Sequence, residues 1–195
     1  MLHTFYQDLP DATVEKLKKI KLVVLDVDGT ISDGGIYLDR TDNELKKFNC
    51  KDGMGVSLLL KAGIDVALLT GRISPLTERR AKELRIPYVI QGQMEKEPAL
   101  LDLIAQCGLT EDEVAVLGDD INDLALYQHS AVAACPSDGY HYMKTIATLV
   151  LTSPGGQGAV RELSDLILMA QGLTTPEGNP TFLKERQLKL HAIGQ

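Results

Sequence analysis

The sequence predicts an α/β fold built on a doubly wound parallel sheet, and three observations support that prediction. Short apolar runs alternate with segments of helical pattern along the chain. The runs are apolar throughout rather than at every second position, which is typical of strands that helices cover on both faces. A chain of 195 residues with 44% hydrophobic residues can bury one substantial core. We therefore expect one domain over residues 1–172 and a tail over residues 173–195.

Six apolar runs are the candidate strands. Each is short and ends in polar residues or glycine, as strands of such sheets do. Ligands bind beyond the carboxyl ends of the strands in open parallel sheets, so the residues directly after each run are the functional candidates. The runs cover residues 22–25, 66–69, 88–90, 114–117, 132–134 and 149–151.

Four segments of helical pattern connect these runs and complete the βαβ rhythm of a parallel sheet. Ser74 and Pro75 form a capping residue followed by a first-turn proline, and Gly63 and Gly108 are suitable helix ends. The expected helices lie within residues 53–63, 74–84, 96–108 and 122–130.

The first run ends in two aspartates, Asp26 and Asp28, within the segment KLVVLDVDGT. Side chains two positions apart in an extended chain point to the same side, so the two carboxylates repel each other unless a cation neutralises them. Asp119 follows the fourth run and reaches the same edge of the sheet. Because Mg²⁺ prefers carboxylate ligands, we expect Asp26, Asp119 and the backbone carbonyl of Asp28 to hold a magnesium ion.

The same edge suits the hydrolysis of a phosphate ester through an aspartyl-phosphate intermediate. We expect Asp26 to attack phosphorus, and Asp28 to protonate the leaving oxygen and then take a proton from water. Thr70 and Lys96 would bind the phosphate oxygens that carry charge in the transition state. Neighbouring residues would add contacts to the same phosphate: Gly29, Thr30 and Gly71.

Two further acids, Asp120 and Asp123, are expected to support this site. Asp120 and Asn122 are suited to capping the helix that begins near Asp123. Asp123 either orients Lys96 or the water shell of the metal, or binds the metal directly, and both interpretations stay open at this point.

Charge and cysteine content argue against several other classes of protein. The chain has 27 acidic and 20 basic side chains, a formal net charge of -7, and no dense basic stripe, which disfavours a nucleic-acid partner. The three cysteines form no C-x-x-C pair, so we expect reduced thiols rather than a disulfide framework or a zinc site. The N-terminal segment lacks a signal-peptide pattern and no run is long enough to span a bilayer, so we expect a cytoplasmic protein without a membrane partner.

Four motifs resemble, in order, those of the haloacid dehalogenase superfamily of Mg²⁺-dependent phosphatases: DVDGT, LLTGR, Lys96 and GDDIND. The resemblance implies a haloacid dehalogenase-like Rossmannoid fold, and it places the nucleophile, the acid/base and the metal aspartate on Asp26, Asp28 and Asp119. About forty residues separate Asp28 from Thr70, and fewer separate Thr70 from Lys96, whereas a separate domain needs about fifty or more. The chain should therefore have no cap domain.

Longer segments within roughly residues 15–172 resemble the 3-deoxy-D-manno-octulosonate 8-phosphate phosphatases, a family that acts in lipopolysaccharide precursor synthesis. These segments include SDGGIYL, ELKKFNCKDGMG, QGQMEKEPA and GGQGAVRE. The resemblance implies hydrolysis of a phosphorylated eight-carbon 3-deoxy acid sugar. Ser57 stands where many relatives have a basic residue. The implied substrate contacts are Asp28, Asn49, Cys50, Lys51, Asp52, Gly53, Ser57, Arg72, Arg80 and Lys96.

Residues 34–49 are expected to form a β-hairpin flap around a turn at Asp42 and Asn43. An isolated hairpin is marginally stable and exposes its edges, so it should pack against copies of itself. The resemblance implies a homotetramer in which a neighbouring subunit closes each active site and Arg80 reaches the site of that neighbour. The tail of relatives covers a neighbouring site, and the tail of this chain either does the same or has no function.

Three alternatives stay open. A phosphatase for a nine-carbon nonulosonate 9-phosphate is the nearest, although Arg72 favours the eight-carbon sugar. A receiver-like phospho-Asp signalling domain also places acids, threonine and lysine at strand ends, but its phosphorylated aspartate lies in the middle of the chain. A catalytically silent scaffold is disfavoured by the complete set of acids.

Overall fold

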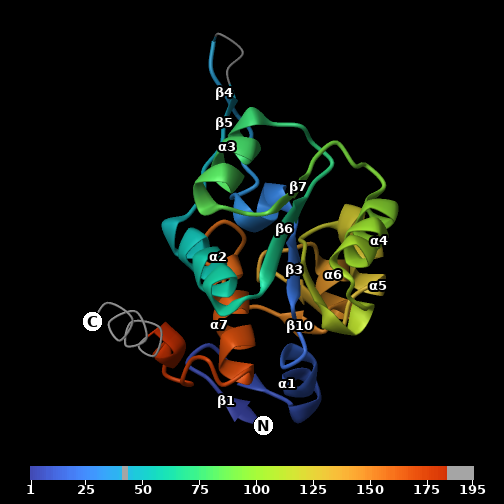
Figure 1. Cartoon of the computed structure of the whole chain (residues 1–195). Coiled ribbons are helices and arrows are strands. Elements are labelled where there is room, and N and C mark those ends of the chain that lie inside the picture. Colours follow the sequence, from blue (N-terminus) through green and yellow to red (C-terminus); the bar gives the residue numbers. More distant parts are fainter. Residues whose placement is uncertain (41–43, 184–195) are drawn as a thin grey trace, which may run out of the picture.

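The computed structural model describes residues 1–40 and 44–183 of the chain, and its centre is a parallel sheet (Figure 1). The six strands lie in the order β10-β9-β8-β3-β6-β7, so the direction in which the chain builds the sheet reverses between β3 and β8. This is the doubly wound sheet that the sequence predicts. The strands are β3 (Leu22–Leu25), β6 (Asp65–Leu69), β7 (Tyr88–Ile90), β8 (Val114–Leu117), β9 (Val132–Cys135) and β10 (Leu149–Val150).

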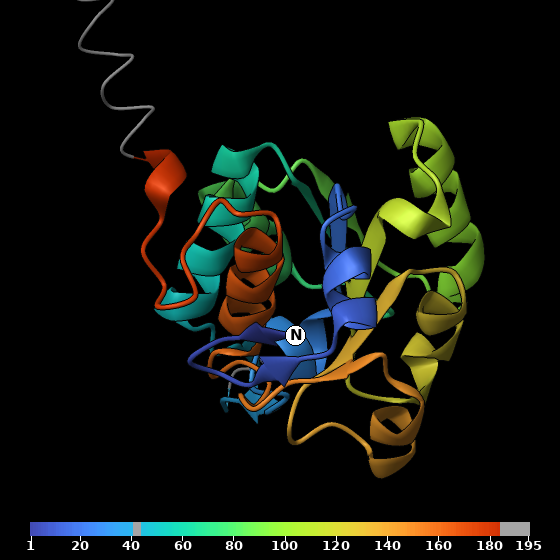
Figure 2. The ribbon, with the colours of Figure 1, turned by 90° about the horizontal axis from the view of Figure 1, so that it is seen from below.

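Helices cover both faces of this sheet, as the view from below shows (Figure 2). Alternate residues of β3 face opposite ways: Val23 and Leu25 pack in one core, and Leu22 and Val24 pack in the other. The first core includes side chains of α1 (Asp11–Leu17), α2 (Cys50–Ala62), α3 (Pro75–Leu84) and α7 (Ala159–Ala170). The second includes side chains of α4 (Lys96–Cys107), α5 (Leu124–Gln128) and α6 (His141–Ile146).

The predicted hairpin is present and projects away from the sheet (Figure 1). Its strands, β4 (Tyr37–Leu38) and β5 (Glu44–Leu45), pair in antiparallel fashion. An isolated bridge between Ser32 and Phe48 closes its base. The turn expected at residues 42–43 lies outside the described residues.

Several local features differ from the sequence-based expectations. A second small antiparallel pair, β1 (Leu2–His3) with β2 (Asp8–Leu9), has strands too short for a hydrophobic pattern to reveal. Helix α2 begins at Cys50, three residues before the expected start, because the side chain of Asn49 accepts a hydrogen bond from the backbone N–H of Lys51 at 2.8 Å. Short turns of 3₁₀ or π type lie at Val27–Ile31, Glu111–Glu113 and Ile121–Asp123.

The expected tail begins beside the first core. The side chains of Leu173, Phe182 and Leu183 pack against that core, and residues 184–195 lie outside the described part of the chain. Among the described residues, the structure has no helix with the length and apolar character that crossing a membrane requires.

Candidate active site

The two central strands deliver their acids to one edge of the sheet. Leu25 of β3 pairs with Leu117 of β8, and the next residue, Asp26, donates its backbone N–H to the carbonyl of Leu117 at 2.9 Å. The carboxylates of Asp26, Asp119 and Asp123 each offer an oxygen within 4.8 Å of the others. This acidic cluster lies at the position where the strand order reverses, which is where such sheets bind ligands.

The close approach of the two strand ends requires glycine. Gly29 has a φ of +90°, and a Cβ added to it would lie 2.1 Å from a carboxylate oxygen of Asp119. A Cβ on Gly118 would lie 2.4 Å from the carboxyl group of Asp123. The hydroxyl of Thr30 donates to Asp119 at 3.4 Å. The glycines of both motifs therefore allow three acids and a hydroxyl to share a small space.

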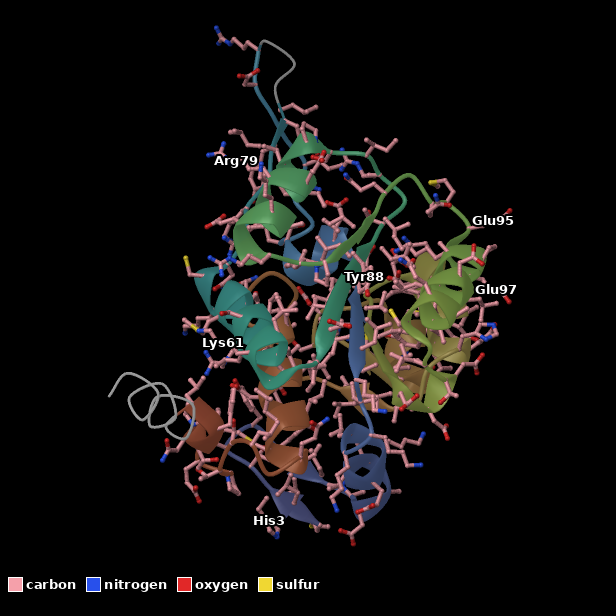
Figure 3. All side chains as sticks on the ribbon, viewed as in Figure 1. His3, Lys61, Arg79, Tyr88, Glu95 and Glu97 are labelled. Carbon is pink, nitrogen blue, oxygen red and sulfur yellow. The ribbon has the colours of Figure 1, made fainter. Side chains whose placement is uncertain are left out.

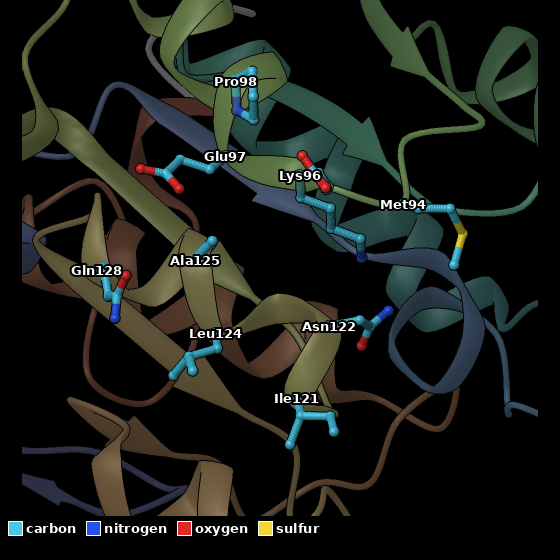
Figure 4. A pocket seen from close by; sticks show the side chains of 10 residues that line it. Met94, Lys96, Glu97, Pro98, Ile121, Asn122, Leu124, Ala125 and Gln128 are labelled. Atoms are coloured by element: carbon cyan, nitrogen blue, oxygen red, sulfur yellow. The ribbon is translucent and has the colours of Figure 1, made fainter.

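Lys96 reaches this cluster from the beginning of α4, and its side chain is fully buried. Its Nζ lies 2.5 Å from Oδ1 of Asp26 and 2.5 Å from Oδ1 of Asp123. Figure 4 shows the side chain extending from α4 toward the segment that follows β3. Burial by itself would lower the pKa of the ammonium group, but the carboxylates of Asp26 and Asp123 outweigh it and raise that pKa. Lys96 is therefore a charged donor at the centre of the site.

The acids themselves are difficult to ionise without a further cation. Burial and then the charge of Asp123 raise the pKa of Asp26 to about 7, and burial and the charges of Asp26 and Asp123 raise that of Asp119 to about 7. One ammonium group does not balance three clustered carboxylates. The donor set, carboxylate oxygens crowded around one point, fits a hard divalent cation such as Mg²⁺.

The supporting acids have distinct contacts. Oδ1 of Asp123 accepts from Lys96, and its Oδ2 accepts from the backbone N–H of Asp119 at 3.1 Å, which suits a residue that orients Lys96. Asp120 accepts from the backbone N–H of Ile121 at 2.7 Å and caps the turn at Ile121–Asp123. The helix that Asp120 or Asn122 was expected to cap, α5, has Asp123 as its N-cap residue and no side-chain capping hydrogen bond.

Thr70 comes to the same edge from β6, the strand beside β3. Its side chain is buried, and its Oγ1 accepts from the backbone N–H of Arg72 at 3.3 Å. The structure thus brings Asp26, Thr70, Lys96 and Asp119 to one edge of the sheet from different elements.

Asp28 lies at the border between this cluster and the hairpin. Its carboxylate contacts the ammonium group of Lys46, and its Oδ2 lies 4.0 Å from Nη1 of Arg72. Arg72 in turn pairs with Glu44 of the hairpin at 2.8 Å. The sequence reasoning missed Lys46 and Glu44. Their spacing could have revealed them, because residues two apart in a strand share a face, so Glu44 and Lys46 are expected on the same side of the hairpin.

The predicted substrate contacts at the start of α2 lie beside α3. Nη2 of Arg80 donates to the backbone carbonyl of Asn49 at 3.3 Å, and the guanidinium carbon lies 5.9 Å from the ring centre of Phe48. A Cβ on Gly53 would lie 2.4 Å from the same Nη2. Within this chain, Asn49, Gly53 and Arg80 therefore form one contact group.

The remaining predicted substrate contacts do not lie together in this chain. Cys50 and Lys51 are exposed at the start of α2. The carboxylate of Asp52 is buried and accepts backbone hydrogen bonds from Gly158 at 3.1 Å and from Arg161 at 2.9 Å, at the beginning of α7. Ser57 lies farther along α2 and lines a separate hollow together with Lys61, Asp65 and Arg85, among other residues.

Two hollows lie near the candidate site: the first borders the acidic cluster through Lys96, and the second borders Lys46, the partner of Asp28. One of about 390 Å³ lies between the beginning of α4 and the segment Ile121–Gln128 (Figure 4). A second, of about 240 Å³, lies between the base of the hairpin and α3, where Figure 3 labels Arg79. It is lined by Lys46, Phe48, Leu76, Arg79, Arg80 and Glu83, so it is mainly cationic.

The model of the haloacid dehalogenase-like hydrolase family matches residues 86–163. The 3-deoxy-D-manno-octulosonate 8-phosphate phosphatase of Haemophilus influenzae is 41% identical over 158 residues, which cover 81% of this chain and 88% of the relative. The crystal structure of the phosphatase of that name from Yersinia pestis is similar with a TM-score of 0.86 and 38% identity, over 88% of this chain and 92% of that one. A Moraxella catarrhalis phosphatase of the same name, in complex with a magnesium ion, a phosphate ion and a KDO molecule, has a TM-score of 0.82 and 38% identity, over 85% and 95% of the two chains.

Proposed function

This chain belongs to the family of the 3-deoxy-D-manno-octulosonate 8-phosphate phosphatases, within the haloacid dehalogenase-like hydrolases, and we propose that it hydrolyses the phosphate monoester of that eight-carbon acid sugar. The products are 3-deoxy-D-manno-octulosonate and phosphate, in the synthesis of lipopolysaccharide precursors. The observation that carries this proposal is the acidic cluster with Lys96 at the reversal of strand order, in a chain that is 41% identical over 158 residues to a phosphatase of that name.

Mg²⁺ is the cofactor, held by the side chains of Asp26 and Asp119 and by the backbone carbonyl of Asp28. When bound, it neutralises the crowded carboxylates and polarises the phosphate. Thr70 and Lys96, with the backbone of Gly29, Thr30 and Gly71, bind the phosphate oxygens. Asp120 and Asp123 support these residues through the contacts described above.

The reaction has two steps at one aspartate. A carboxylate oxygen of Asp26 forms a bond to phosphorus as the bond to the sugar oxygen breaks, and Asp28 gives a proton to that leaving oxygen. A water molecule then attacks the phosphoryl group, Asp28 takes a proton from it, and the Asp26 carboxylate is regenerated. Lys96 donates to the oxygens on which charge develops.

The acid end of the sugar needs cations outside the acidic cluster. Arg72 is half exposed and pairs with Glu44, so a substrate carboxylate can replace that partner and bind both nitrogens of the guanidinium group. The loop of Asn49, Cys50, Lys51, Asp52 and Gly53 provides the neighbouring contacts, and Ser57 is the weakest member of the set because it lines another hollow.

The enzyme acts as a homotetramer in which a neighbouring subunit completes each active site. Apolar side chains of the hairpin support this: Ile36 is 64% exposed, Leu38 69% and Leu45 61%. Such a surface on a marginal hairpin is best stabilised by packing against other hairpins. Arg80 contacts Asn49 in this chain, so its action in a neighbouring site requires that neighbour to approach the start of α2.

Residues 1–172 form the phosphatase domain and residue 173 begins the tail, whose proposed role is to cover a neighbouring site. The enzyme belongs in the cytoplasm, where the thiols of Cys50, Cys107 and Cys135, all free, stay reduced.

The decisive experiment measures phosphate release from eight-carbon and nine-carbon acid-sugar phosphates and from hexose phosphates, with Mg²⁺ and with excess chelator. We expect the highest kcat/KM for 3-deoxy-D-manno-octulosonate 8-phosphate and no turnover in chelator. A higher value for the nine-carbon substrate would favour that alternative, and a flat profile would leave only a general phosphatase. A receiver-like domain would be phosphorylated without turning over.

The oligomer is tested separately by light scattering and by Arg80→Ala. We expect a tetramer, and a KM about tenfold higher for the variant because a charged substrate contact is lost. A monomeric protein of full activity would contradict the shared active site.

A further inference from the structure

The carboxylate of Asp28 is held by a lysine of the hairpin. Asp28 lies in the turn after β3, and its side chain is 26% exposed. Its Oδ1 accepts a hydrogen bond from Nζ of Lys46, whereas its Oδ2 lies 4.0 Å from Nη1 of Arg72, beyond hydrogen-bond distance. Proton transfer to a leaving oxygen requires the acid to point within hydrogen-bond reach of it. Lys46 therefore contacts the carboxyl group of Asp28, whose orientation decides how easily the sugar oxygen is protonated as it leaves.

The side chain of Lys46 is buried although both of its neighbours in the chain are exposed. Its side chain is 2% exposed, whereas that of the adjacent Lys47 is 58% exposed and Leu45 is 61% exposed. A buried ammonium group is costly unless it is paired, so Lys46 stays in this position because Asp28 compensates its charge. The pair thus connects the turn after β3, which carries Asp28, with the hairpin.

The hairpin depends on such attachments, because each of its strands has two residues and a pair this short is marginal alone. The bridge between Ser32 and Phe48 fixes its base, and Lys47 pairs with Asp33 at 3.3 Å on the outside. Lys46 connects the hairpin to Asp28, the proposed acid of the reaction. The position of the hairpin and the orientation of Asp28 are therefore coupled through one side chain.

We propose that Lys46 is a positioning residue for Asp28, and this inference rests on the proposed phosphatase activity. By holding Oδ1, Lys46 leaves Oδ2 to exchange the proton. Asp28 enters the first step with a proton on Oδ2 while its Oδ1 accepts from Lys46. The bond between Asp26 and phosphorus forms, the bond between phosphorus and the sugar oxygen breaks, and that proton moves from Oδ2 to the sugar oxygen. Asp28 leaves the step as the carboxylate that Lys46 balances. Lys46 transfers no proton in this step and acts through its hydrogen bond to Asp28.

The test compares two phosphate monoesters that differ in their need for an acid. An alkyl phosphate must have its leaving oxygen protonated, whereas p-nitrophenolate departs without a proton. Lys46→Met removes the ammonium group and keeps the length of the side chain. In single-turnover release of the leaving group, we expect a loss of about tenfold to hundredfold on the alkyl ester, part of what general acid catalysis contributes, and of less than about threefold on the aryl ester.

Two matched variants accompany this measurement. Lys47→Met changes the neighbouring lysine, which contacts Asp33, and should leave both rates unchanged. Lys46→Arg keeps a cationic donor and should restore most of the alkyl-ester rate. Equal losses of Lys46→Met on the two esters would show that Lys46 acts in binding or folding and would overturn the proposal, as would full activity on both.

Protein that does not fold is recognised by circular dichroism. If Lys46→Met fails in this way, Lys46→Gln replaces it and must show the same split between the two esters. Wild-type enzyme that cleaves simple alkyl phosphates but spares the acid-sugar phosphate would overturn the proposed substrate. The comparison for Lys46 would then be made on the simple alkyl ester.

Discussion

The acidic cluster and the hairpin meet at Asp28, but they are stabilised in opposite ways. In the cluster, the side chains of Asp26, Asp123 and Lys96 are 4%, 0% and 0% exposed, and backbone and side-chain contacts fix each of them. In the hairpin, Leu38 and Leu45 are more than half exposed and the strands are two residues long. The cluster is thus organised before substrate arrives, whereas the hairpin needs packing partners. We expect changes in the cluster to remove turnover, and changes around the hairpin, other than at Lys46, to alter binding.

The largest effect is expected from Asp26→Asn. The amide can still accept a hydrogen bond from Lys96, so the fold should persist, but it cannot attack phosphorus and kcat should fall by about 10⁴-fold or more. Phosphate release and thermal unfolding measure the two outcomes. Asp102→Asn, which changes an exposed acid of α4, is the control. Retention of wild-type turnover by Asp26→Asn would show that the nucleophile is another residue.

Lys96→Met should reduce both activity and stability. Removing the ammonium group leaves Asp26 and Asp123 buried without their shared partner, which costs about 3 to 5 kcal/mol in buried ion pairs. We expect kcat to fall by about 10² to 10³, since a donor to the transition state is lost.

Urea unfolding in metal-free buffer gives the change in free energy, with Lys82→Met, an exposed lysine of α3, as the control. A variant that kept its kcat and only raised KM would place Lys96 with the binding residues and break the distinction between the two regions.

Arg72→Ala should affect binding more than chemistry. Its side chain is 45% exposed and pairs with Glu44 at 2.8 Å, so its loss leaves the acidic cluster intact. We expect KM for the acid-sugar phosphate to rise about tenfold and kcat to change by less than about threefold. A phosphate ester without a carboxylate is the control, because its KM should not change. An equal increase for both substrates would assign Arg72 to the phosphate rather than to the acid group.

The sequence predicted the cluster well because its geometry is local. Asp26 is the first residue after β3 and Asp119 the second after β8, both strands have unmistakable apolar runs, and parallel pairing alone brings the two strand ends together. The hairpin was found in outline, but Lys46 was not identified, because its role depends on how the hairpin folds over Asp28. Similarly, the capping of α7 by Asp52 joins residues more than a hundred positions apart, and no pattern within α2 indicates it.

The smallest predicted effect concerns pH and separates the cluster from the rest of the molecule without a substitution. In the metal-free protein the pKa values of Asp26 and Asp119 are raised to about 7, well above the usual range of unfolded aspartates. The folded state therefore binds more protons than the unfolded state between about pH 4 and pH 7, so its stability should fall as pH rises through this window. Mg²⁺ binds the deprotonated acids, and its stabilisation should grow over the same range.

Thermal unfolding with chelator and with Mg²⁺, at several pH values from about 5 to 8, measures both trends as shifts in Tm of a few degrees. Asp26→Asn should weaken the dependence in chelator because it removes one of the titrating acids of the cluster, whereas Asp102→Asn should leave it unchanged. A metal-free protein whose Tm stays constant with pH across this range would mean that the acids are already ionised and compensated by Lys96 alone. The cluster would then owe its organisation to the lysine rather than to the metal, and its stability would no longer depend on the cofactor that its chemistry requires.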